Sequence, residues 1–188
     1  MTNSFHLQCN AARLLDVQVK NATFMPVVVS ARDPAYGDRH VFDVLFDDLV
    51  VGYSVGYPYG QRLMTWQDFD RLGMPRRELR RRAASLLDYS LDRVEIHGLP
   101  PVLMASFGGI ASSLLLCDEL WDSLEGRVPG SVVVGVPARD VVMITGSQSP
   151  SGVARARRAV DRVFFAGGRH LVRRGLLTRR NRMWQPMR

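Results

Sequence analysis

The side chains that most often form metal or acid–base sites are scattered along this sequence. The four histidines, His6, His40, His97 and His170, include no pair three or four residues apart, and no Cys-x-x-Cys is present. Metal ligands usually cluster at such spacings. We therefore predict no metal site, and we find no motif for a cofactor.

Ser112 is the serine that comes nearest to a nucleophile motif. A nucleophile elbow has the pattern Gly-x-Ser-x-Gly, which places the hydroxyl on a sharp turn between a strand and a helix. In the stretch 108–113 (GGIASS) the glycines stand in the wrong places. We expect Ser112 and Ser113 in the first turn of a buried helix, where a hydroxyl can satisfy a free backbone group.

The segment 146–152 (GSQSPSG) lies between a predicted strand and a predicted helix. A helix start can bind phosphate through its free N–H groups. The Gly-Lys-Ser/Thr ending of a P-loop is missing here, so a capped turn is the favoured interpretation and an anion site the alternative.

Arg139 and Asp140 adjoin at a predicted turn between two apolar strands. Structural pairing is the favoured interpretation, because no second carboxylate or base is near in sequence to support acid–base chemistry. The alternative is a site, since functional residues gather on loops. An enzyme with a site near Arg139, Asp140 and Ser112 therefore stays one hypothesis.

Basic residues are concentrated at the C-terminal end. Residues 150–188 carry a net charge of +10, with Asp161 as their one acid, while the other residues carry −3. This segregation indicates an anionic partner or an acidic face elsewhere on the molecule. The favoured interpretation is nevertheless a compositional bias of the genome, because the chain has 24 arginines and one lysine.

The candidate residues for binding a partner or an anion lie in that basic region and at the turn described above. Arginines contact phosphates, and an aromatic side chain such as Trp184 can stack on bases. Adjacent arginines in a strand point to opposite faces, which weakens the case for one continuous basic surface. The candidates are Arg139, Asp140, Arg173, Arg174, Arg179, Arg180 and Arg182.

Hydrophobic periodicity and turn residues predict the secondary structure. Thr65 and Asp68 form a predicted capping box for a helix that Gly73 ends, and Pro75 opens the next helix. Two further helices are predicted over 110–124, as a continuous buried helix, and from Pro150 to Gly167. A short amphipathic helix is predicted within 1–22. Strands are predicted over 24–30, 41–46, 49–57, 93–97, 102–107, 131–136 and 141–145, with a closing strand or hairpin over 171–184.

This order of elements shows no regular alternation of strand and helix, which favours an α+β fold. We expect a mixed, largely antiparallel sheet packed against three to four helices. The length predicts a single domain over 1–188, with a possible subdivision near 98–101.

The sequence also predicts the compartment. Cys9 and Cys117 are the only cysteines, which favours a reducing environment over a disulfide framework. The first twenty residues lack the pattern of a signal peptide. The longest apolar stretch, 110–117, is too short to span a membrane. We therefore expect a soluble cytoplasmic protein that is not bound to a membrane.

Three groups of short motifs follow one another along the chain, and the second and third are the most specific. The groups are 49–53 with 64–65 and Leu79, Ala83, Leu86 and Leu87; 107–116 with 120–121; and 132–134 with 136–141. Together, over about residues 45–184, they resemble the YtpQ-like family of bacterial proteins of unknown function, although residues 110–111 (IA) replace the acidic or aromatic residue that usually precedes the serine. The resemblance implies a bacterial cytosolic protein and carries no active site.

Three hypotheses follow for the function. The leading one is a non-enzymatic binding protein of accessory or immunity type that acts through protein–protein contact, in which the basic third meets an acidic patch. The second is nucleic-acid binding through the arginine-rich C-terminal segment. The third is the enzyme with a site near Arg139, Asp140 and Ser112. The sequence leaves the oligomeric state open.

Overall fold

The computed structural model describes residues 24–56 and 62–187. The predicted helix within 1–22 lies outside these residues. The helices are α1 Trp66–Leu72, α2 Arg76–Tyr89, η2 Leu91–Arg93, η3 Ala111–Leu116, α3 Asp118–Leu124 and α4 Pro150–Phe165, of which η2 and η3 are 3₁₀ helices. The strands are β1 Phe24–Ser30, β2 Asp43–Phe46, β3 Leu49–Val55, β4 Arg62–Leu63, β5 Glu95–Leu99, β6 Val102–Ser106, β7 Val132–Ala138, β8 Val141–Gly146, β9 Leu176–Arg180 and β10 Met183–Pro186.

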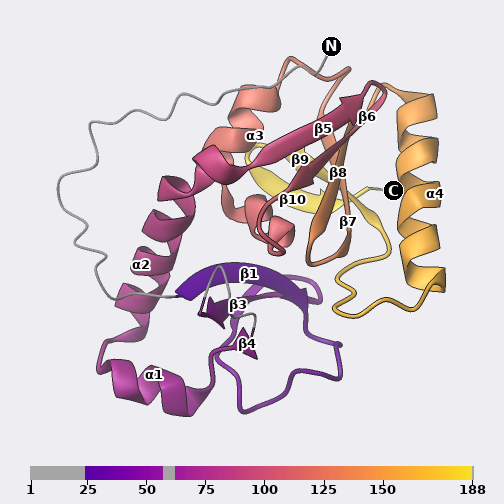
Figure 1. The fold of residues 1–188 in the computed structure, drawn as a ribbon. Helices are drawn as coiled ribbons and strands as arrows, with labels where there is room; N and C mark the ends of the chain where they lie inside the picture. The colour runs from indigo at the N-terminus through magenta and orange to yellow at the C-terminus, as the bar shows by residue number, and fades with distance from the viewer. Residues whose placement is uncertain (1–23, 57–61, 188) are drawn as a thin grey trace.

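The strands form two sheets, and the α+β fold class is confirmed (Figure 1). The smaller sheet has the order β1-β3-β2, with β4 also paired to β3, and the larger has the order β10-β9-β7-β8-β6-β5. Each described strand pairing is antiparallel. The expected single sheet is thus divided in two. The predicted subdivision point near 98–101 falls at the turn between β5 and β6, two paired strands of the larger sheet.

Strand β7 is covered on both faces, as its continuous apolar sequence predicts. All seven of its residues are buried. Val132 and Val134 join the main hydrophobic core together with Trp121 and residues of β1, so this core connects the two sheets. Val133 points to the other face, where it packs in a separate cluster with Val160 of α4.

Helix α1 begins and ends where its sequence predicts, and α2 begins where its sequence predicts. The Thr65 hydroxyl accepts a hydrogen bond from the Asp68 N–H, and the Asp68 carboxylate accepts one from the Thr65 N–H, which completes the capping box. Gly73 ends α1 in the left-handed conformation that favours glycine. Helix α2 follows Pro75 and buries Leu79, Ala83 and Leu87.

The predicted continuous helix over 110–124 is wrong, because η3 and α3 are separate and Cys117 lies between them in a non-helical conformation. The Trp121 indole N–H donates to the Leu114 carbonyl at 2.5 Å, and the Cys117 N–H donates to the same oxygen at 3.0 Å. That carbonyl would accept from residue 118 in a continuous α-helix. The burial prediction holds, since residues 111–115 are all buried.

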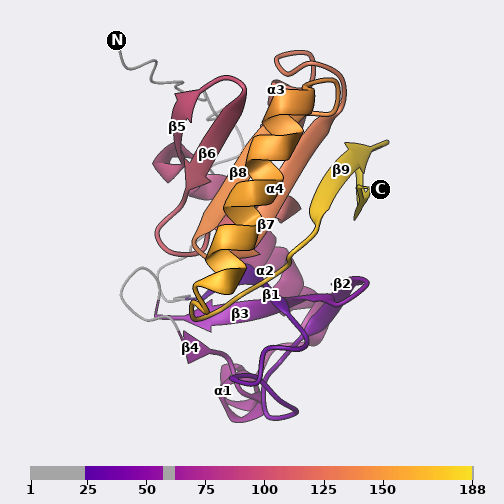
Figure 2. The same cartoon turned by 90° about the vertical axis from the view of Figure 1, so that its right-hand side faces the viewer.

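Helix α4 lies across one face of the larger sheet, against β7, β8 and β6 (Figure 2). Helix α2 lies on the opposite side of the molecule, against β1 of the smaller sheet (Figure 1). Within the described residues, no helix has both the length and the apolar character needed to cross a membrane.

Candidate functional site

The structure distributes the predicted arginines over separate places. The side chain of Arg179 on β9 is 0% exposed and donates to three carboxylates of the α3 region at 2.7–2.8 Å, those of Asp118, Asp122 and Glu125. Arg182 also donates to Asp122, at 2.7 Å. These two arginines therefore neutralise an acidic helix and hold β9 and the following turn against it.

Arg173 and Arg174 follow α4 and are likewise paired. Arg173 donates to Asp47 at 2.9 Å and to Asp48 at 2.8 Å, which ties the C-terminal region to the β2–β3 turn. Arg174 donates to Asp161 of α4 at 2.9 Å. Arg180 is exposed and has no ion pair with any described residue. The predicted candidates thus do not make one continuous basic surface.

Helix α4 carries a different set of arginines on its outer face. Its buried face is set by Gly152, Ala156 and Val160, which pack toward the larger sheet. Positions 155, 158 and 162 fall on the opposite face at the spacing of helical neighbours. Arg155, Arg158 and Arg162 are accordingly exposed. We call these three arginines together with Phe165 the α4 stripe.

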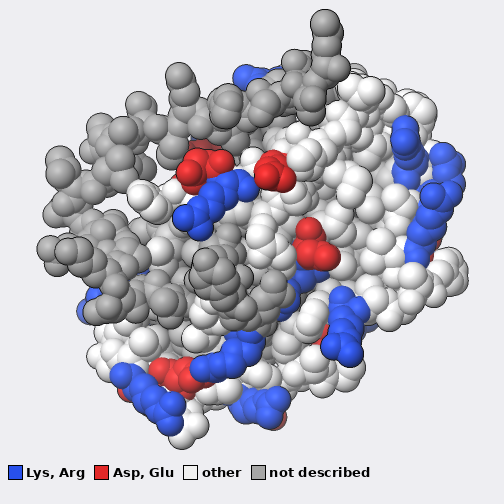
Figure 3. Space-filling model, in the orientation of Figure 1, with Lys and Arg blue, Asp and Glu red and all other residues white. Residues whose placement is uncertain are grey.

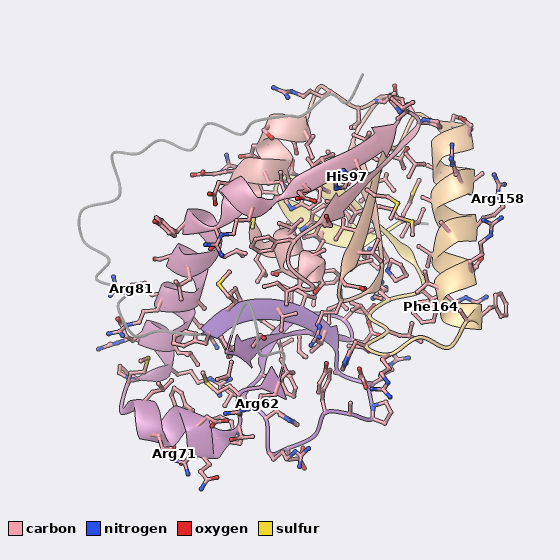
Figure 4. All side chains as sticks on the ribbon, in the orientation of Figure 1. Arg62, Arg71, Arg81, His97, Arg158 and Phe164 are labelled. Carbon is pink, nitrogen blue, oxygen red and sulfur yellow. The ribbon has the colours of Figure 1, made fainter. Side chains whose placement is uncertain are left out.

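The figures show how the α4 stripe is presented. Blue side chains line the edge of the molecule where α4 lies (Figure 3). Arg158 points away from the sheet into solvent (Figure 4). Within the described part of the chain, Arg155, Arg158 and Arg162 have neither a hydrogen bond nor an ion pair to an acidic group.

Helix α2 gives an internal comparison, because it is also rich in arginine. Arg81 and Arg82 both pair with Glu78 at 2.8 Å. Arg76 and Arg80 both pair with Asp43. Two pairs of arginines on α2 are thus neutralised by acids, whereas residues 24–56 and 62–187 provide no acidic partner for those of the α4 stripe.

An exposed aromatic ring ends the stripe. Phe165 is 81% exposed, and the Arg174 guanidinium lies over its ring at 5.3 Å from the centroid. Arg169, four residues on, is exposed and unpaired among the described residues. The stripe therefore offers unpaired guanidinium groups beside an accessible ring.

The third group of predicted residues lies at and beside the turn between β7 and β8. Arg139 is buried, Asp140 is exposed, and Ser112 is fully buried with a hydroxyl oxygen that has no hydrogen-bond partner in the described structure. The backbone brings Ser112 and Arg139 together, since the Ser112 N–H donates to the Arg139 carbonyl at 2.9 Å. Burial removes Ser112 from contact with a substrate in solvent.

Arg139 belongs instead to a polar network that the sequence did not indicate. Tyr36 and His170 are joined by a hydrogen bond of 2.9 Å between the phenol oxygen and Nδ1, and their rings stack at 6.1 Å. Burial raises the pKa of Tyr36, and the positive charge and a hydrogen bond of Arg139 oppose this shift. Burial also lowers the pKa of His170, with Arg139 adding to that effect.

The sequence contained a signal for the α4 stripe but none for this network. Spacings of three and four residues among Arg155, Arg158 and Arg162 are visible once α4 is placed. Tyr36 and His170 are 134 residues apart and meet only in the folded chain. Over the described residues, no group of three His, Cys, Asp or Glu side chains is arranged to hold a metal ion.

Comparison with known proteins leaves the family open. No family model, no curated protein and no solved structure matches this chain. The resemblance to the YtpQ-like family stays a prediction.

Proposed function

We propose that this protein binds single-stranded nucleic acid, without sequence preference, through the α4 stripe. The observation that supports this most is that Arg155, Arg158 and Arg162 have no acidic partner among the described residues, while the arginines of α2 at positions 76, 80, 81 and 82 are paired. Unpaired arginines on a rigid helix are available to phosphates, and phosphate contacts dominate affinity in this class of complex.

The dimensions of the stripe fit a nucleic-acid backbone. Seven residues of α-helix separate Arg155 from Arg162, which is about 10 Å along the axis. About three phosphates of one strand occupy that length. Phe165 at the end of the stripe supplies a ring for stacking, which favours a single strand because bases in a duplex are already stacked.

Fluorescence anisotropy with a labelled oligothymidylate of about 20 nucleotides tests the proposal, since that length exceeds a typical site for a single strand. We expect binding at low salt with a strong salt dependence. Replacing Arg155, Arg158 and Arg162 together by Ala should reduce the slope of log K against log salt by about 2. Phe165→Ala should weaken binding about tenfold at constant salt dependence.

The matched control is the triple variant Arg77→Ala, Arg81→Ala and Arg82→Ala, which removes the same charge from exposed positions on α2. It should keep most of the affinity. Equal losses in the two triple variants would show that net charge alone drives binding and would contradict a site on α4. Failure of the wild-type protein to bind at low salt would also contradict it.

Protein–protein contact is the second candidate function, and the same stripe supports it. Arginine and aromatic residues are enriched among the residues that dominate protein interfaces, and Phe165 is exposed among arginines. The partner would be a protein with an acidic surface. An affinity pull-down with and without nuclease treatment separates the two candidates, because only a direct protein partner survives nuclease. A bacterial, cytoplasmic setting is part of both proposals.

A further inference from the structure

A groove lies beside the Tyr36–His170 network, between the loop after β1 and the segment that joins α4 to β9. Its volume is about 820 Å³, within the range of small-molecule sites. Pro34, Ala35, Phe164 and Leu171 contribute apolar surface, and His170 lies among the lining residues. The groove could therefore take an organic molecule of moderate size.

The hydrogen bond from Tyr36 decides which ring nitrogen of His170 is available to a ligand. The raised pKa of Tyr36 keeps its hydroxyl protonated at neutral pH, and the lowered pKa of His170 keeps the imidazole neutral. The Tyr36 oxygen already accepts from Arg139, and among the described residues Nδ1 of His170 is the one acceptor within reach of the Tyr36 O–H. The arrangement that satisfies both groups therefore has the hydroxyl donate to Nδ1. In a neutral ring whose Nδ1 accepts, Nε2 carries the proton. His170 thus has one N–H donor left to use.

The backbone at His170 is held in an unusual conformation. Its φ is 58°, in the left-handed region that only a few per cent of non-glycine residues adopt, with asparagine, aspartate and histidine the most frequent among them. The His170 carbonyl accepts a hydrogen bond from the Arg139 N–H at 3.1 Å, which helps to fix the chain there. Such conformations cost about 1–3 kcal/mol and concentrate at functional sites.

Positive charge surrounds the groove in excess of its acids. Arg169 is exposed and has no partner among the described residues. Arg32 makes one loose ion pair of 3.5 Å with Asp48, which Arg173 already neutralises at 2.8 Å. The remaining acid, Asp33, has a buried Oδ2 atom that faces His170 Nδ1 at 3.9 Å. The exposed charge at the mouth is therefore mainly basic.

We propose that this groove binds a small organic phosphate monoester. Arg169 and the Nε2–H of His170 donate to the phosphate, and the apolar lining residues contact the organic group. A guanidinium and an imidazole N–H are both strong donors to phosphate oxygens. Arg139, Tyr36 and His170 form a chain of hydrogen bonds that polarises the imidazole toward an anion. The groove and the α4 stripe have no residue in common, although Arg174, which lines the groove, also lies over the Phe165 ring. Binding of the phosphate monoester does not depend on nucleic-acid binding.

Titration with phenyl phosphate, followed by NMR of the histidine ring nitrogens, tests the proposal. We expect saturable shifts of the His170 signals with a dissociation constant of about 1 mM or below. Phenol and inorganic phosphate should each bind more weakly, because each lacks one half of the recognised group. Equal binding of phenol would contradict phosphate recognition, and equal binding of inorganic phosphate would contradict the role of the apolar lining.

Two variants test the donors. Arg169→Ala should weaken phenyl phosphate binding about tenfold, the usual loss for one charged hydrogen bond. Arg77→Ala is the matched control, since Arg77 is also exposed and unpaired among the described residues, and it should change nothing. His170→Asn places a residue that tolerates the left-handed backbone at this position, so the variant should fold. It should bind phenyl phosphate more weakly than the wild-type protein.

Three results would overturn the proposal. They are an absence of saturable shifts at His170 in the wild-type protein, an equal loss of affinity in Arg77→Ala, and full affinity in a folded His170→Asn variant. Thermal unfolding of each variant identifies a loss that comes from misfolding. Oligonucleotide binding by the same samples gives a separate result for the α4 stripe.

Discussion

Arg179 Nη2 lies 2.8 Å from Asp118 Oδ1, and this pair joins β9 to α3 although the arginine side chain is 0% exposed. Asp122 and Glu125 accept from the same guanidinium, while all three carboxylates keep contact with solvent. Their partial hydration lowers the electrostatic value of each pair. The three carboxylates together nevertheless stabilise the enclosed guanidinium, since a buried charge without partners lowers the stability of the folded protein.

We expect Arg179→Ala to lower the free energy of unfolding by about 3 kcal/mol, through loss of packing and of the link between β9 and α3. Arg182→Ala is the control, because Arg182 contacts Asp122 from a side chain that is 69% exposed. Its cost should be below about 1 kcal/mol. Urea unfolding measures both, and similar small values for the two variants would contradict a structural role for Arg179.

The second prediction concerns acid stability around Asp43. Burial acts to raise the pKa of Asp43, but hydrogen bonds from Arg80 and Tyr53 and the charge of Arg76 outweigh it and lower the pKa below 3.8. A lowered pKa in the folded state stabilises the protein above the unfolded value, and that stability is lost as the pH falls through the folded value. Asp43→Asn should therefore cost about 2 kcal/mol at pH 7.

The difference in the free energy of unfolding between wild type and Asp43→Asn should disappear below the folded pKa of Asp43. There the wild-type carboxyl is protonated and, like the amide of Asn, carries no charge. Urea unfolding at a series of pH values from 7 downward, through the unfolded pKa of Asp43 and as far as the protein stays folded, follows this loss. Glu78, whose pKa its hydrogen bonds to Arg81 and Arg82 lower to about 2, titrates alike in both proteins and does not contribute to the difference. A constant difference at every pH would contradict an ionised Asp43.

The third prediction tests the capping box of α1. Thr65→Ala removes the acceptor for the Asp68 N–H, and we expect a loss of about 1 kcal/mol. Ser85→Ala serves as the control, because the Ser85 hydroxyl donates to the Arg81 carbonyl within α2 and caps nothing. Its effect should be within about 0.5 kcal/mol, since alanine also has the higher helix propensity. Equal effects would argue against the capping box.

The fourth prediction concerns the docking of α4. A Cβ atom at Gly152 would stand 2.2 Å from Thr145 Oγ1 and 2.9 Å from the Pro101 carbonyl oxygen. Gly152→Ala should push the start of α4 away from the larger sheet and cost about 2 kcal/mol. Gly168→Ala meets nothing nearer than 4.0 Å and should be nearly neutral. Hydrogen exchange in α4 reports the displacement, and unchanged protection would contradict it.

The sequence predicted the parts of the fold that depend on near neighbours. Thr65, Asp68 and Gly73 define α1 because caps act within a few residues. The break at Cys117 was missed because it depends on the Trp121 side chain, which competes for the Leu114 carbonyl seven residues earlier. Periodicity reports which face is apolar and does not report such competition.

The candidate site was predicted less well than the fold. The sequence shows where the basic residues are concentrated along the chain, yet it could not show which arginines are already paired. Arg179 meets acids more than fifty residues away, and Arg173 meets Asp48 at a separation of 125 residues. The arginines of the α4 stripe are those left after such pairs are assigned. A candidate binding surface is therefore located by its unpaired charges, and the pairs are known only once the chain is folded.

The link between Arg179 and α3 also bears on the order of events during synthesis. Asp118, Asp122 and Glu125 leave the ribosome 54 to 61 residues before the arginine that joins them to β9. In the larger sheet, β9 lies between β7 and β10. Until β9 is made, β7 has one open edge and α3 is an acidic helix with no counter-charge from that strand. The unpaired edge of β7 makes a chain without β9 the form most exposed to aggregation.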